Sequence, residues 1–193
     1  MKPKVGIISC DYDGTLAGYY ELNHEDQIKK FQEDMQIFKN EIFLIKTLEK
    51  LDYVYFSLNT REDRIEVLTT VLSAIFGQED WLHPGPQFLA DGIYFFDLES
   101  QNLSGPIQEE YDERYIKGDK LNNLSVFALK HIEKEDIVSV THIEDGKNYS
   151  FDELELLKDV GIETHIINLP HQSTRNHMLE TFQDNVSGRV DKK

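Results

Sequence analysis

The segment VGIISCDYDGTL, residues 5–16, decides the fold of this chain. Its first half, residues 5–10, is an apolar run that predicts a short buried strand, and the polar half starts directly at Asp11. Asp11 and Asp13 are two positions apart, so at a strand end both carboxylates point to the same side, where a cation or phosphate can sit. Gly14 permits a sharp turn away from the strand. D-x-D-G also occurs as a plain acidic turn, but its position after a strand favours a ligand site.

The same residues carry a family resemblance. Asp11-Tyr12-Asp13-Gly14-Thr15-Leu16 resembles the D-x-D-G-T-[LV] signature of haloacid dehalogenase-like (HAD) phosphohydrolases. The resemblance implies that Asp11 is a nucleophile that becomes an aspartyl-phosphate and that Asp13 is the general acid and base. It also implies a Mg²⁺ ion, which shields the anionic nucleophile from an anionic substrate. Because the dehalogenase branch lacks an acid at the second position, Asp13 favours phosphoryl chemistry.

The second motif of that family is a hydrogen-bond donor to the phosphoryl oxygen at the end of the second strand. It falls on Asn59, Thr60 and Arg61, and Ser57 is the alternative if the strand ends earlier. An Asn amide can donate to a phosphate oxygen as the usual Thr or Ser does. Arg61 is equally consistent with a substrate-phosphate ligand and with an ordinary surface charge.

The third motif is a lysine near the start of a helix, which neutralises charge that develops in the transition state. Lys117 and Lys120 both qualify, and we favour Lys120 because an apolar helical stripe continues from it. The fourth motif supplies an acid to Mg²⁺ from the end of a later strand. Asp145 matches it, with Glu144 as its neighbour, while Tyr149 stands where the family often has a further Asp. The metal set implied by the resemblance is therefore Asp11, Asp13 and Asp145.

Strand and helix patterns alternate along the chain, which predicts an α/β fold: a doubly wound, Rossmann-like parallel sheet of about five strands with helices on both faces. The predicted strands are residues 5–10, 53–58, 92–96, 137–143 and 164–169. The predicted helices are residues 24–50, 62–76, 121–132 and 150–159, and residues 81–87 are predicted to be a loop.

We expect residues 1–170 to form one HAD-like catalytic domain. Residues 171–193 are a polar, partly disordered C-terminal segment in this interpretation, with one further helical turn at residues 178–182. Only a short flap fits before residue 24, and residues 97–118 can hold an extended loop or a small hairpin. The resemblance therefore implies a minimal cap and an open site. Such a site suits a large substrate, a phosphoprotein or a polynucleotide end, or a small phosphate ester if another subunit covers it.

Composition limits the classes of function. Hydrophobic residues make up 39% and charged residues 29% of the chain, as in globular proteins, and no apolar run reaches the ~20 residues of a membrane span. The net charge of −16 disfavours extended nucleic-acid binding. Cys10 is the single cysteine, which excludes an internal disulfide and a cysteine-based zinc site. No Sec-type signal is visible, so we expect a cytoplasmic protein, although a dedicated secretion system need not leave an N-terminal mark.

Two hypotheses follow. In the first, the chain is a Mg²⁺-dependent phosphatase that hydrolyses a phosphate monoester through Asp11. In the second, it is a catalytically weak HAD-like domain that binds a phosphorylated partner or serves as a scaffold, as Asn59 and the incomplete fourth motif suggest. The paired carboxylates Asp11 and Asp13 favour the enzyme, because a pure scaffold has no physical need for them.

Overall fold

The computed structural model describes residues 1–16, 24–60, 64–89, 92–106, 119–145, 154–169 and 175–190. Within these ranges the side chains of residues 13, 14, 145, 169, 175–179 and 189–190 are not described. The elements follow the order β1 (Lys4–Cys10), the π-helical turn η1 (Tyr12–Leu16), α1 (Glu25–Glu49), β2 (Tyr53–Leu58), α2 (Ile65–Ile75), β3 (Leu82–Pro84), β4 (Gln87–Phe88), β5 (Ile93–Asp97), β6 (Asn102–Ser104), α3 (Lys120–His131), β7 (Asp136–Asp145), α4 (Glu155–Asp159), β8 (Glu163–Leu169) and α5 (Arg175–Val190).

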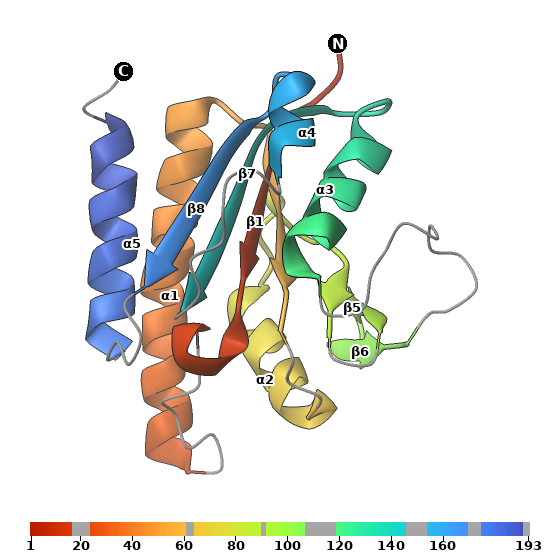
Figure 1. Cartoon of the computed structure of the whole chain (residues 1–193). Helices are drawn as coiled ribbons and strands as arrows, with labels where there is room; N and C mark the ends of the chain where they lie inside the picture. Colours follow the sequence, from red (N-terminus) through yellow and green to blue (C-terminus); the bar gives the residue numbers. More distant parts are fainter. Residues whose placement is uncertain are drawn as a thin grey trace.

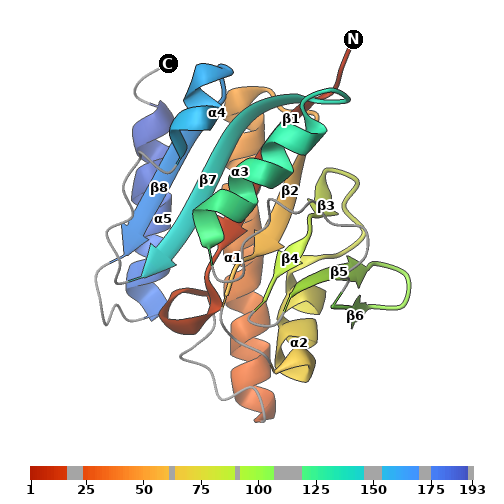
Figure 2. The same cartoon turned by 45° about the vertical axis from the view of Figure 1, so that its right-hand side comes forward.

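Five parallel strands form the main sheet, in the order β3-β2-β1-β7-β8 (Figures 1 and 2). The chain leaves β1 in one direction through β2 and β3, and later returns to its other side through β7 and β8. The strand order therefore reverses between β1 and β7, and in open α/β sheets the crevice at the carboxyl ends of two such strands is the usual ligand site. The prediction of a Rossmann-like parallel α/β sheet is confirmed.

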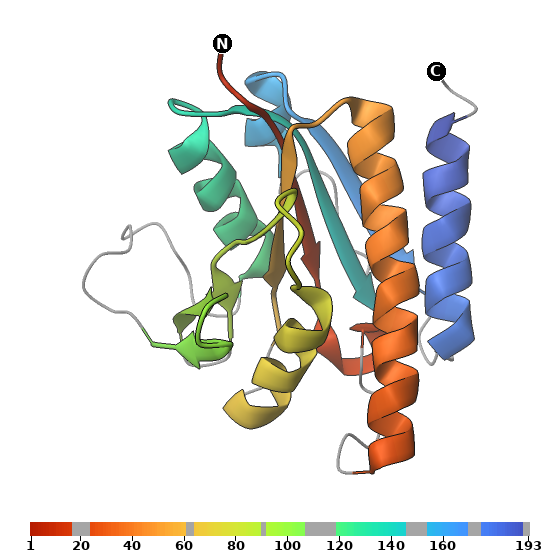
Figure 3. The ribbon, with the colours of Figure 1, turned by 180° about the vertical axis from the view of Figure 1, so that it is seen from behind.

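Helices cover both faces of this sheet. α1, α2 and α5 lie on one face, best seen in Figure 3, and bury a large apolar core that includes Phe31, Leu68 and Phe182. α3 and α4 lie on the opposite face over a second core that includes Leu124 and Leu157. Both faces of the parallel strands are thus buried, as the apolar composition of β1 requires. No helix among the described residues is both long and apolar enough to cross a membrane.

The predicted third strand belongs to a different sheet. Residues 93–97 form β5, which pairs antiparallel with β4 and β6 in a separate three-stranded sheet. The fifth strand of the main sheet is instead β3, which lies inside the predicted loop at residues 81–87. The prediction was wrong here because Pro84 and Pro86 indicated a loop, whereas a proline is tolerated on an edge strand, which β3 is. Since β6 lies within residues 97–118, that stretch begins with a strand of a small hairpin; residues 107–118 lie outside the described residues.

The C-terminal segment also differs from the prediction. α5 has 16 residues rather than a single turn at residues 178–182, and it packs along α1. Phe182 is fully buried, with its ring centroid 5.0 Å from that of Phe38. The sequence of α5 shows almost no amphipathic pattern, so local periodicity could not indicate its length. The predicted helix at 150–159 appears as α4 in its second half, and residues 146–153 lie outside the described residues.

Candidate active site at the β1–β7 switch point

Two rows of polar side chains cross the strands β2, β1 and β7 at their carboxyl ends. The inner row is Ser57, Ser9 and His142, which are paired in register across the three strands. The outer row lies two residues further along each strand and consists of Asn59, Asp11 and Glu144. Residues in register on parallel strands point to the same face, and alternate residues of a strand share that face. Both rows therefore face α3, at the point where the strand order reverses.

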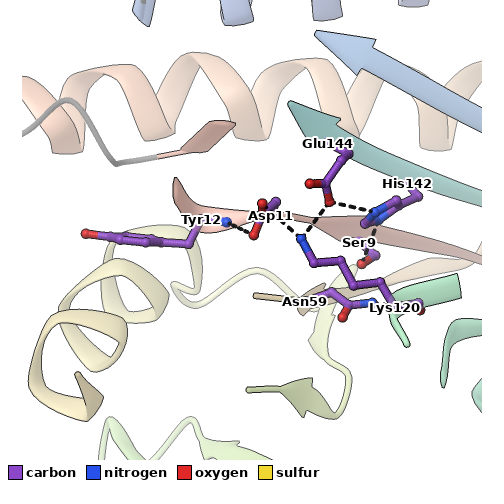
Figure 4. A network of polar contacts seen from close by, with 7 residues as sticks. All are labelled: Ser9, Asp11, Tyr12, Asn59, Lys120, His142 and Glu144. Atoms are coloured by element: carbon purple, nitrogen blue, oxygen red, sulfur yellow. Dashed lines mark hydrogen bonds and ion pairs between the residues drawn. The ribbon is translucent and has the colours of Figure 1, made fainter. Parts of the chain in front are cut away.

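The centre of the outer row is an ion-pair cluster (Figure 4). Lys120 Nζ lies 2.9 Å from Asp11 Oδ2 and 2.6 Å from Glu144 Oε2. All three side chains are buried, with Asp11 at 6% and Glu144 at 3% of full exposure. The other Asp11 oxygen, Oδ1, accepts a 2.9 Å hydrogen bond from the Tyr12 backbone N–H. One lysine is thus shared between two buried carboxylates that come from neighbouring strands.

The start of α3 holds Lys120 in this position. Asp119 is the N-cap of α3 and its side chain accepts from Asn122 N at 3.0 Å, so Lys120 is the first residue of the helix. Asn59 Nδ2 donates to the Lys120 carbonyl at 2.9 Å, which ties the end of β2 to the same helical turn. An Asn amide has two N–H donors, so one remains in addition to this bond. Asn59 therefore contributes to positioning Lys120.

The cluster perturbs the ionisation of each member. Burial raises the pKa of Asp11 from its ordinary 3.8 to about 6; the Lys120 charge opposes this and the Glu144 charge adds to it. Burial alone would raise the pKa of Glu144, but the contact with His142 and the Lys120 charge hold it below its ordinary value. Burial alone would lower the pKa of Lys120, but the charges of Asp11 and Glu144 raise it. At neutral pH Lys120 and Glu144 are charged and Asp11 is mostly ionised.

One residue of the inner row, His142, contacts the Glu144 carboxylate of the outer row. His142 is completely buried; its Nδ1 lies 3.2 Å from Ser9 Oγ and its Nε2 lies 3.3 Å from Glu144 Oε2. Complete burial lowers the pKa of His142, so its imidazole is neutral at physiological pH. Ser57 is fully buried too, and its hydroxyl has no hydrogen-bond partner within the described part of the chain. His142 is a packed residue of β7, and it also contacts the charged cluster.

Gln87, a residue of the three-stranded β4–β5–β6 sheet, fixes the end of β2 beside the site. β3 ends at Pro84, opposite Phe56, so it offers no further pairing to β2. The buried amide of Gln87 takes its place: Oε1 accepts from Leu58 N at 2.7 Å, and Nε2 lies 2.5 Å from the Gly85 carbonyl and 3.3 Å from that of Phe56. The β4–β5–β6 sheet is thereby attached to the strand that carries Asn59.

The predicted site residues divide into those that the structure brings together and those that it does not describe. Asp11 and Lys120 are in direct contact, and Asn59 is joined to Lys120 through its carbonyl. Thr60 is buried and its backbone N–H donates to the Phe88 carbonyl at 2.9 Å. Two groups of predictions lie outside the description: the side chains of Asp13 and Asp145, whose backbones belong to η1 and β7, and the residues Arg61 and Lys117.

Sequence reasoning did not assign the roles of two members of the cluster. Glu144 was recognised as the neighbour of Asp145 without a function, and it is the second carboxylate, beside Asp11, that contacts Lys120. His142 had no motif to mark it. The available signal was strand alternation: His142 and Glu144 are two residues apart in β7 and so share a face, as do Ser9 and Asp11 in β1.

The described side chains include only part of the expected metal-ligand set. Among the described side chains, no group of three or more His, Cys, Asp or Glu residues is arranged to hold a metal ion. The expected set depends on Asp13 and Asp145 in addition to Asp11. The donor chemistry of this set fits Mg²⁺, because carboxylate oxygens are its preferred protein ligands. The described cluster also carries one net negative charge at neutral pH, with Lys120 against Asp11 and Glu144, which favours a bound cation.

Comparison of the chain with models of protein families, with curated proteins and with solved structures yields no match.

Proposed function

We propose that this chain is a Mg²⁺-dependent phosphatase of the HAD-like type, which hydrolyses a phosphate monoester through an aspartyl-phosphate on Asp11. The observation that carries the proposal is the 2.9 Å contact between Asp11 Oδ2 and Lys120 Nζ at the β1–β7 switch point. Asp11 belongs to the first motif and Lys120 to the third, which are more than a hundred residues apart in the sequence. Their meeting in one buried cluster supports the interpretation of both motifs as parts of one site.

In the first step, an Asp11 carboxylate oxygen attacks the phosphorus atom and the bond to the leaving oxygen breaks. Asp13 protonates the leaving oxygen, which departs as an alcohol. In the second step, Asp13 takes a proton from water, the resulting hydroxide attacks the same phosphorus, and the bond to Asp11 breaks. Inorganic phosphate leaves, and Asp11 and Asp13 return to their starting states.

Lys120 supplies a fixed positive charge to these steps. A buried ammonium group stabilises negative charge on the phosphoryl oxygens without having to reorganise during the reaction. Because Glu144 Oε2 lies 2.6 Å from Nζ, the lysine keeps a carboxylate partner when Asp11 turns to the substrate. The raised pKa of Lys120 keeps the group protonated throughout the neutral range.

Charge balance supports the metal in this proposal. The described cluster is already net negative, and a phosphate monoester dianion adds further negative charge at the same place. A divalent cation held by Asp11, Asp13 and Asp145 would supply the missing positive charge and polarise the phosphoryl group.

The proposed substrate is large, either a phosphoprotein or a polynucleotide end. The described part of the second insertion point is only the short β5–β6 hairpin, in which β6 has three residues. The net charge of −16 disfavours binding to long nucleic-acid tracts, so a nucleic acid would be engaged through its phosphorylated terminus alone.

The test is hydrolysis of an aryl phosphate with and without Mg²⁺, for the wild type, Asp11→Asn and the control Asp80→Asn. Asp80 is an exposed carboxylate far from the cluster in sequence. We expect metal-dependent turnover that is lost in Asp11→Asn and kept in Asp80→Asn. Wild-type-like turnover in Asp11→Asn would overturn the assignment of the nucleophile. Phosphopeptides and 3′-phosphorylated oligonucleotides then define the substrate class.

One observation favours the second candidate function, a weakly active domain that binds a phosphorylated partner. Asp11 is almost fully buried, and both of its oxygens already have partners, Tyr12 N and Lys120 Nζ. A nucleophile must give up at least one such contact to react. Absence of turnover on every phosphate tested, together with absence of Mg²⁺ binding, would place this function first.

A further inference from the structure

Glu144 Oε2 has two neighbours that differ in charge. Lys120 Nζ lies 2.6 Å from it and His142 Nε2 lies 3.3 Å from it. On the far side of the imidazole ring, Nδ1 lies 3.2 Å from Ser9 Oγ. Figure 4 shows the resulting line of contacts from Ser9 through His142 and Glu144 to Lys120, which then reaches Asp11. Only the last two residues of this line, Lys120 and Asp11, belong to the expected motifs.

Chemistry limits which atoms can donate along this line. Glu144 is ionised beside the Lys120 ammonium group, and an ionised carboxylate can only accept. His142 Nε2 lies at ion-pair distance from Glu144 Oε2, but this contact does not have the geometry of a hydrogen bond. When the neutral ring carries its one proton on Nε2, that N–H faces Glu144 and Nδ1 accepts from the Ser9 hydroxyl. The positioning role proposed below requires this tautomer.

We propose that His142, fixed by Ser9, is a positioning residue that holds the Glu144 carboxylate and through it keeps Lys120 in place while Asp11 leaves the ion pair to attack phosphorus. The inference rests on the proposed phosphatase function. It explains why a site with one lysine contains two carboxylates that contact it. Asp11 reacts, and Glu144, held on its other side by His142, anchors the lysine.

The burial of the inner row supports this interpretation over simple core packing. Ser9 and His142 are both fully buried, on a face of the sheet whose core further from the carboxyl ends is mainly apolar, with Val5, Ile7 and Val140. A buried polar group contributes to stability only when its hydrogen bonds are made, so an apolar pair would be the simpler filling. The polar pair is located two residues from the two carboxylates of the cluster, where it can orient one of them.

Three substitutions separate positioning from packing. His142→Leu removes the ring nitrogen that lies 3.3 Å from Glu144 Oε2, and His142→Gln keeps an amide N–H at about the position of Nε2. His165→Leu is the matched control: His165 is a strand histidine of β8 whose Nε2 lies 3.2 Å from Glu163 Oε1, away from the cluster. We expect His142→Leu to lower kcat about 10- to 100-fold with little change in KM, because a misplaced catalytic group has that effect. His142→Gln should recover most of kcat, and His165→Leu should leave it unchanged.

A kcat of folded His142→Leu within about twofold of the wild type would overturn the proposal, since a factor that small is under 0.5 kcal/mol of barrier. Equal losses in His142→Leu and His142→Gln would do the same, because the retained donor would then have no effect. KM and the midpoint of thermal unfolding are measured for each variant, so that loss of folded protein is not mistaken for loss of kcat.

Nuclear magnetic resonance tests the same contacts without turnover. We expect the ring ¹⁵N shifts of His142 to report the neutral Nε2–H tautomer, and the Lys120 Cε–H signal to shift in His142→Leu but not in His165→Leu. A Nδ1–H tautomer, or an unmoved Lys120 signal, would overturn the positioning role. If no variant or wild type hydrolyses any phosphate while these signals behave as expected, the phosphatase function fails and the positioning of Lys120 by His142 stands.

Discussion

Lys120 Nζ lies closer to Glu144 Oε2, at 2.6 Å, than to Asp11 Oδ2, at 2.9 Å. The lysine of the cluster is therefore held most closely by a carboxylate outside the motif that carries the nucleophile. Removing one partner of a buried charge cluster leaves an uncompensated charge, whereas an exposed pair contributes little. The cluster is thus the part of the site where single substitutions have the largest and most specific effects.

Asp11 should make the folded protein less stable at neutral pH than a neutral residue would. Its pKa is about 6 in the folded state against 3.8 ordinarily, so between these values the folded state binds more protons than the unfolded chain. Stability therefore falls as pH rises through this window, and the loss levels off about one pH unit above the folded-state pKa. We expect Asp11→Asn to be more stable than the wild type at pH 7.5 by on the order of 2 kcal/mol, with the difference shrinking toward pH 4.

The measurement for this prediction is urea unfolding of metal-free protein at several pH values. Asp80→Asn serves as the control, since its carboxylate is exposed. A stability difference between Asp11→Asn and wild type that stays constant from pH 4 to 7.5 would contradict the raised pKa of Asp11.

Lys120→Met should destabilise the protein, because Asp11 and Glu144 would then face each other without a cation. Loss of one partner of a buried charge cluster costs about 3 kcal/mol or more. The pKa of Asp11 should rise further, since the lowering effect of Lys120 disappears. Unfolding by urea and phosphatase assays on Lys120→Met and Lys117→Ala check this prediction. Equal losses of activity in the two variants would leave Lys120 without a special role.

Gln87→Ala should weaken the attachment of the β4–β5–β6 sheet to β2. The substitution leaves the Leu58 N–H and the Gly85 carbonyl without the partner that the Gln87 amide supplies, while the Phe56 carbonyl still accepts from the Gly85 N–H. Unsatisfied buried groups cost about 1–3 kcal/mol each, so we expect a loss of about 3 kcal/mol in the free energy of unfolding. Gln36→Ala, which affects an exposed amide, should change it by less than about 0.5 kcal/mol. Comparable values for the two variants would show that the Gln87 bonds do not fasten the sheet.

Phe182→Ala tests the docking of α5 on α1. Phe182 is fully buried against Phe38, and removing a buried aromatic ring costs about 3–5 kcal/mol. Phe43 lies on α1, as Phe38 does, and its ring is 48% exposed and contacts Trp81. The cost of Phe43→Ala in the free energy of unfolding should therefore stay near 1 kcal/mol. Denaturant unfolding of both variants distinguishes a docked α5 from a peripheral one, for which Phe182→Ala would be as mild as Phe43→Ala.

Local pattern in the sequence was sufficient for most elements of the fold. The apolar run at residues 5–10 predicted β1, and spacings of three and four predicted α1, α2 and α3 to within a few residues. Local pattern could not show which sheet a strand belongs to. β5 has the same apolar, aromatic character as a core strand, yet it pairs antiparallel outside the main sheet, because pairing depends on neighbours that are distant in sequence. The formation of α5 likewise depends more on packing against the apolar surface of α1 than on the periodicity of its own sequence.

The same division holds for the site. The sequence by itself predicted that Asp11 follows a buried strand and that Lys120 lies near the start of a helix, because both follow from local apolar patterns. Tertiary structure alone decided that Lys120 meets Asp11 and Glu144, and that His142 and Ser9 lie beneath Glu144. The contact between Ser9 and His142 follows from the register of β7 on β1, which places residues more than 130 positions apart side by side. Strand register is set by packing across the whole sheet, and no local run of residues contains it.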